Sequence, residues 1–168
     1  MDLHSLTGAS RFESAMASRP LARSAHFMVH HIAQSQLSTG HARRPAGVVD
    51  KSVDNAVDDP VDNRTDRVEA ACLRLGLVVP KRHARRSVTR TLVKAQIRAG
   101  MRRHLDALVA GDWVVRLRAP IDRKQFPSAR SEALAALLHG ELDVLLGDAA
   151  RRARRAQAQA GSAPVHPT

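Results

Sequence analysis

Nine basic residues and no acidic residue lie between Lys81 and Arg103. Five of them recur at every fourth position: Arg86, Arg90, Lys94, Arg98 and Arg102. Residues four apart lie one turn above each other on an α-helix, so this spacing predicts a helix over roughly residues 85–108 with one continuous basic ridge. Like charges at this spacing repel unless a polyanion neutralises them, and phosphate backbones are the commonest such polyanion. The segment therefore predicts a helix that binds nucleic acid, with a merely solvated basic face as the alternative.

The overall charge points the same way. The 168 residues carry a formal net charge of +11 and have a pI near 11.5. Such a balance indicates a nucleic acid or an anionic membrane as partner. No run of about 18 apolar residues is present, which argues against a membrane span, and the first residues lack the features of a signal peptide. We therefore expect a cytoplasmic protein with no membrane partner, and a single cysteine, Cys72, excludes a disulfide framework.

A long acidic stretch interrupts this basic chain. Residues 33–69 have no apolar period, contain Pro45, Gly47 and Pro60, and carry a run of Asp residues. This composition predicts a disordered insertion. Two interpretations stay open, a solvated linker or an intramolecular mimic of phosphate that shields the basic ridge until RNA binds.

Periodicity predicts the remaining elements in this order: helix 10–16, strand 26–32, strand 71–79, helix 85–108, strand 113–118 and helix 128–146. Ser10 and Glu13 fit a capping box at the start of the first helix. The order predicts one small α+β domain, residues 1–147, in which helices cover a sheet. The sequence after Gly147 is basic and of low complexity, which predicts a disordered tail over residues 148–168.

No set of residues fits a catalytic or metal site. A strand would place His30 and His31 on opposite faces, so both cannot bind one ion. We therefore expect no catalytic residue and no metal ligand on the protein. Met28, His30, Arg116 and Arg118 instead predict a sheet surface beside Phe12 that covers unpaired bases while arginines follow the backbone. A membrane-surface or chaperone-like basic protein is the weakest of the function classes, because no exposed amphipathic anchor is evident.

The basic residues before the helix belong to the same predicted site, because helix N-terminal amides also hold phosphate. The predicted RNA-binding residues are Lys81, Arg82, Arg85, Arg86, Arg90, Lys94, Arg98 and Arg102.

Three segments together resemble the protein subunit of bacterial ribonuclease P. They are Gly76–Arg82, Ser87–Arg90 and Asp112–Arg116, with Lys94 and Arg98 in between. Phe12 and Phe27 match the opening of that family, and the resemblance covers about residues 7–146. Two positions that are basic in the family are Leu92 and Ala95 here.

The resemblance implies a small α/β sandwich like the second domain of ribosomal protein S5, with a left-handed βαβ crossover. It also implies a protein that binds ribonuclease P RNA and precursor tRNA and assists removal of the 5′ leader. The RNA subunit with Mg²⁺ would perform the hydrolysis, the protein alone being inactive, and no protein partner is expected. The leader cleft would be lined by Phe12, Met16, Met28, His30 and Arg116, with Arg90, Lys94 and Arg98 at its edge. The alternative function is a non-catalytic RNA-binding module of ribosomal-protein type.

Overall fold

A computed structural model describes residues 2–34, 72–128 and 131–161 of the chain. Almost all of the acidic stretch that was predicted to be disordered, residues 33–69, lies outside these residues. Its two interpretations therefore remain predictions.

One five-stranded sheet forms the centre of the molecule, in the order β1-β4-β5-β3-β2. The strands are β1 (Leu3–Ser5), β2 (Ala22–Arg23), β3 (Phe27–Ala33), β4 (Leu73–Val78) and β5 (Gly111–Leu117). β4 runs parallel to β1 and β5, whereas β3 runs antiparallel to β5 and β2. The three predicted strands are confirmed. Sequence analysis missed β1 and β2, because two or three residues are too few to show a period of two.

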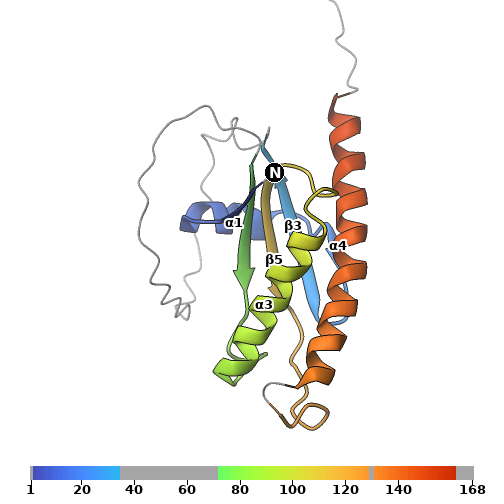
Figure 1. Cartoon of the computed structure of the whole chain (residues 1–168). Coiled ribbons are helices and arrows are strands. Elements are labelled where there is room, and N and C mark those ends of the chain that lie inside the picture. The colour runs from blue at the N-terminus through green and yellow to red at the C-terminus, as the bar shows by residue number, and fades with distance from the viewer. Residues whose placement is uncertain (1, 35–71, 129–130, 162–168) are drawn as a thin grey trace, which may run out of the picture.

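The helices cover both faces of this sheet (Figure 1). Helix α1 (Ala9–Ala17) lies on one face, and α3 (Ser87–Arg103) and α4 (Glu132–Gly161) lie side by side on the other. Helix α3 joins the adjacent parallel strands β4 and β5 by a left-handed crossover, which few proteins have (Figure 1). The predicted α+β sandwich is confirmed.

Alternation along β5 divides the core between the two faces. Trp113, Val115 and Leu117 are fully buried with the side chains of α3 and α4, whereas Val114 packs with Leu6 and Ala15 on the α1 side. Gly76 lies beside Val114, and a Cβ atom there would stand 2.6 Å from the Phe12 ring. The absence of a side chain at this position lets α1 approach the sheet.

The predicted starts of all three helices are wrong, and α4 begins at Glu132 rather than at residue 128. Helix α1 begins at Ala9 after Gly8, whose φ of 90° turns the chain, and no side chain caps it. The predicted capping box of Ser10 and Glu13 therefore does not form. Helix α3 begins at Ser87 rather than near residue 85, because Pro80 accepts backbone hydrogen bonds from His83 and Ala84 in a turn before it.

The predicted boundary of the domain at residue 147 is also wrong. Helix α4 continues to Gly161, and Ala149, Ala150 and Ala153 are buried along it. The segment 148–161 is therefore part of the folded domain, while residues 162–168 lie outside the described residues. The sequence does not show this buried stripe, because its side chains are small alanines with little apolar area.

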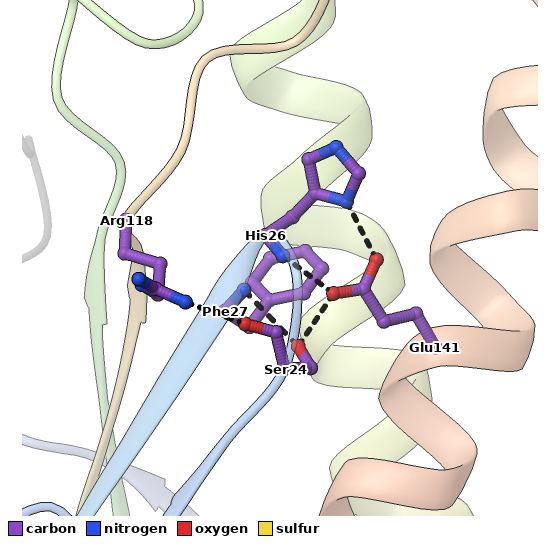
Figure 2. Close-up of polar contacts among 5 residues, drawn as sticks. All are labelled: Ser24, His26, Phe27, Arg118 and Glu141. Carbon is purple, nitrogen blue, oxygen red and sulfur yellow. Dashed lines mark hydrogen bonds and ion pairs between the residues drawn. The ribbon is translucent and has the colours of Figure 1, made fainter.

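Glu141 of α4 fastens the β2–β3 hairpin to the helix layer (Figure 2). Its carboxylate accepts hydrogen bonds from the Ser24 hydroxyl at 2.5 Å and from the His26 backbone N–H at 2.6 Å, and its second oxygen lies 2.7 Å from His26 Nδ1. Burial alone would raise the pKa of Glu141, but these bonds outweigh burial and lower it. The carboxylate is therefore ionised in the folded protein at neutral pH.

Candidate nucleic-acid interface

The turn before α3 presents three of the predicted RNA-binding residues to solvent. Lys81, Arg82 and Arg85 are exposed, and the first turn of α3 contains no acidic residue. Backbone N–H groups at a helix N-terminus carry partial positive charge that favours anions. This end of α3 therefore combines exposed cations with a helix N-terminus, as a phosphate contact requires.

Arg86 and Arg90 have structural partners instead. Arg86 Nη1 donates to the Pro127 carbonyl at 2.6 Å, which ties the turn to the β5–α4 connection. Arg90 Nη1 donates to the carbonyls of Ala84 and Arg85 at 3.1 and 2.9 Å. These two predicted RNA-binding residues thus hold the loop that carries Lys81 and Arg82, and a regular spacing in the sequence could not distinguish this role.

The rest of the predicted ridge consists of Lys94, Arg98 and Arg102, and its last two members are exposed. The opposite side of α3 is buried through Val93, Ile97 and Met101. None of the three side chains has a hydrogen bond or ion pair with another residue in the part of the chain that the structure describes. They are therefore available to an external anion, whereas Arg103 of the same helix pairs with Asp143 of α4 at 3.1 Å.

A second candidate surface lies on the α1 side of the sheet. Strand pairing places Arg23 opposite Met28, and Met28 opposite Arg116, so the three side chains form one row across β2, β3 and β5. Phe12 and Met16 of α1 pack against Val114 on the same face. The structure thus brings the five predicted leader-cleft residues to one side of the sheet. Arg90, Lys94 and Arg98, predicted at the edge of the cleft, belong to α3 on the other face.

His30 differs from the prediction in one respect. Only 3% of it is exposed, so it offers almost no surface for a base to cover. Its Nδ1 lies 3.0 Å from the Ser18 carbonyl, which connects β3 to the end of α1. Burial lowers the pKa of His30 despite that bond, and the nearby charges of Arg116 and Arg23 lower it further. A neutral His30 that positions α1 fits this geometry better than a residue that contacts RNA.

Arg23 is a site residue that sequence analysis missed. Its side chain is exposed and its strand has two residues, so only the β2–β3 pairing places it beside Met28 and Arg116. In the sequence, only the positive charge of Arg23 marks it as a candidate RNA-binding residue. The predicted surface residue Arg118 is exposed as well, but its Nη1 donates to the Ser24 carbonyl at 2.9 Å (Figure 2).

A buried ion-pair cluster fixes α1 over this surface. Asp112 of β5 is fully buried, and its Oδ1 lies 3.4 Å from Arg74 Nη1 and 3.7 Å from Arg11 Nη1. Arg74 comes from β4 and Arg11 from α1, so the carboxylate joins both to the central strand. Removing Arg74 would leave the buried carboxylate poorly compensated, whereas the Arg11 side chain is 35% exposed and contributes less.

The described residues do not assemble a metal site. No group of three or more His, Cys, Asp or Glu side chains within residues 2–34, 72–128 and 131–161 could hold an ion. His30 and His31 lie on opposite faces of β3, as predicted, and the His31 ring packs against Trp113 with centroids 4.3 Å apart. None of the described helices is long and apolar enough to cross a membrane.

Comparison with known proteins gives consistent matches. The family model for Ribonuclease P matches residues 2–140. The ribonuclease P protein component of Burkholderia pseudomallei is 47% identical over 82 residues, which cover 49% of this chain and 60% of that protein. The one from Paraburkholderia xenovorans is 40% identical over 91 residues, 54% of this chain and 66% of that protein. The chain thus aligns with less than two thirds of the length of either relative.

Solved structures agree on the fold. The RNase P protein of Staphylococcus aureus superposes with a TM-score of 0.52 at 14% identity, over 85% of this chain and 92% of that chain. A mutant of that protein, described as defective in mRNA degradation, superposes with a TM-score of 0.50 at 15% identity and covers 85% of each chain. At this identity the similarity establishes the fold alone.

Proposed function

The chain belongs to the ribonuclease P protein family, and from this premise we propose that it is the protein subunit of a ribonucleoprotein that removes the 5′ leader from precursor tRNA. The protein would bind ribonuclease P RNA and the leader, and the RNA would perform the hydrolysis. Since the relatives are bacterial proteins, we also propose that it acts in the cytoplasm.

One observation carries the proposal: the fold separates two surfaces suited to RNA. Lys94, Arg98 and Arg102 lie on the α3 side of the sheet, and the row of Arg23, Met28 and Arg116 lies on the α1 side. A protein that holds a structured RNA and a single-stranded leader at once needs two such surfaces. We assign the α1 side to the leader, because Met28 and the rim of Phe12 and Met16 add apolar area on which bases can lie between arginines.

The described residues do not fit a Mg²⁺ site of the protein's own. Mg²⁺ binds oxygen ligands, usually carboxylates, and Asp112, the fully buried acidic residue, already faces Arg74 and Arg11. We therefore propose that Mg²⁺ belongs to the RNA subunit and that the protein contributes positive charge.

Reconstitution tests the proposal. Purified protein added to the ribonuclease P RNA of a Burkholderia relative should restore cleavage of precursor tRNA at low Mg²⁺, and nuclease-treated protein alone should cleave nothing. Binding of RNA without any rescue of cleavage would favour the ribosomal-type binding module instead. Cleavage by RNA-free protein would contradict the proposal.

Variants then test the two surfaces separately. Arg116→Ala should weaken binding of leader-bearing precursor and leave mature tRNA binding unchanged. Lys94→Ala with Arg98→Ala should reduce the salt slope of RNA binding by about 1.4–1.8, from about 0.7–0.9 for each phosphate contact. Equal losses for precursor and mature tRNA in this second variant would place the α3 ridge on the RNA subunit. Arg103→Ala removes a cation from the same helix but from the side that faces Asp143, so it is the matched control.

A further inference from the structure

The last part of α4 carries a cluster of charge outside the region that the family model matches. The match ends at residue 140, and α4 continues to Gly161. Residues 148–161 contain four arginines, Arg151, Arg152, Arg154 and Arg155, and one acidic residue, Asp148. This segment is about 20 Å long at 1.5 Å per residue, and its end extends beyond the sheet (Figure 1).

Two of these arginines anchor the helix to the body of the protein. Arg152 Nη1 donates to the Leu21 carbonyl at 3.2 Å, and its Nη2 lies 2.8 Å from Asp148 Oδ2. Arg154 Nη2 donates to the Asp106 carbonyl at 2.7 Å. The two side chains flank the buried stripe of Ala149, Ala150 and Ala153 on either side, so the rotation of this part of α4 about its axis is fixed.

That rotation directs the other two arginines into solvent. Arg151 and Arg155 are four residues apart, which places them one turn above each other on the side opposite the alanine stripe. The Arg151 side chain is 70% exposed, and its Nη2 lies 3.5 Å from Asp148 Oδ1, a surface pair of little strength. The Arg155 side chain is exposed and has no polar partner among the described residues.

We propose that Arg151 and Arg155 form a second contact for the phosphate backbone of a structured RNA, separate from the α3 ridge. The inference deepens the proposed function and rests on it, since ribonuclease P RNA is the expected ligand. The binding is electrostatic and reads no sequence, because it involves phosphates rather than base edges.

The chemistry of this surface favours RNA over an acidic protein. From Arg151 to Gly161 the helix consists of Arg, Ala and Gln before its final Gly, with no aromatic or large aliphatic residue. Protein interfaces are centred on such residues, especially Tyr, Trp, Phe and Met, and this surface lacks that centre. Phosphate binding requires only cations at suitable positions, and the anchored helix holds them there before the RNA arrives.

The test is the affinity of the full-length Arg151→Ala/Arg155→Ala protein for ribonuclease P RNA, measured across monovalent salt at fixed Mg²⁺. Alanine is the best helix former, so α4 persists, which circular dichroism verifies. Loss of two phosphate contacts should lower the salt slope by about 1.4–1.8 and weaken binding roughly tenfold at physiological salt. The charge-retaining Arg151→Lys/Arg155→Lys variant should keep most of the slope, and Gln157→Ala/Gln159→Ala should match the unmodified protein.

The outcomes separate this inference from the proposed function. Unchanged affinity and slope in the Arg151→Ala/Arg155→Ala variant would overturn the inference, even where the unmodified protein restores cleavage. A lowered slope would support the RNA contact even where the unmodified protein restores no cleavage and the proposed function fails.

Discussion

Replacing Glu141 by alanine should loosen the β2–β3 hairpin that carries Arg23 and Met28. The carboxylate accepts hydrogen bonds from the Ser24 hydroxyl, the His26 backbone N–H and the His26 ring, and its side chain is 15% exposed. A hydrogen bond to a charged group contributes about 1.5–3 kcal/mol when buried, and water reaches part of this site. We therefore expect a loss of about 2–3 kcal/mol in the free energy of unfolding, well below the sum of three buried bonds.

Urea unfolding at pH 7 measures this loss, and Glu141→Gln is the matched control. The glutamine oxygen still accepts from Ser24 and from the His26 N–H, so this variant should lose less than half as much. A double-mutant cycle with Ser24→Ala should show coupling, because both side chains take part in one network. Equal stability of the alanine variant and the unmodified protein would refute the reasoning, since it would mean that solvent replaces all three bonds at no cost.

The same carboxylate predicts an acid dependence. The folded-state pKa of Glu141 is lowered, so its stabilisation is fully present above the unfolded-state pKa near 4.5. It is lost as pH falls below that value through the folded-state pKa. The stability difference between the unmodified protein and Glu141→Ala should therefore shrink only below about pH 4.5.

Three further predictions concern the fold. Gly76→Ala places a Cβ atom 2.6 Å from the Phe12 ring, so it should cost about 1–3 kcal/mol in urea unfolding and lower precursor affinity by shifting α1. Burial lowers the pKa of His31 to about 4. The free energy of unfolding should therefore be highest above pH 6.5 and fall by up to about 3 kcal/mol as pH falls toward 4, because the unfolded state binds the proton more tightly. His31→Gln should flatten the stability across this pH window. Deleting residues 148–161 removes three buried alanines and should lower stability by about 2–3 kcal/mol, whereas a disordered tail would leave the urea midpoint unchanged.

The sequence by itself determined the layers of this protein and its chemical class. Alternation in 26–32, 71–79 and 113–118 and helical spacing in 85–108 are local patterns, and each predicted element is present. A long cationic stretch without acidic residues is also local, so the basic side of α3 and a polyanionic partner could be inferred without coordinates. The family resemblance rested on the order and spacing of short motifs, which are properties of the sequence alone, although Leu92 and Ala95 depart from the family pattern.

Only the tertiary structure decided which arginines are available to bind. Arg86, Arg90, Lys94 and Arg98 look equivalent in the sequence, but the first two donate to carbonyls of Pro127, Ala84 and Arg85. These bonds depend on how a loop folds back, which no spacing records. The pairing of a two-residue strand likewise brought Arg23 to Met28 and Arg116. The folded end of α4 was also decided by the tertiary structure. Alanine contributes too little apolar area to mark a buried face in the sequence until a neighbouring surface covers it.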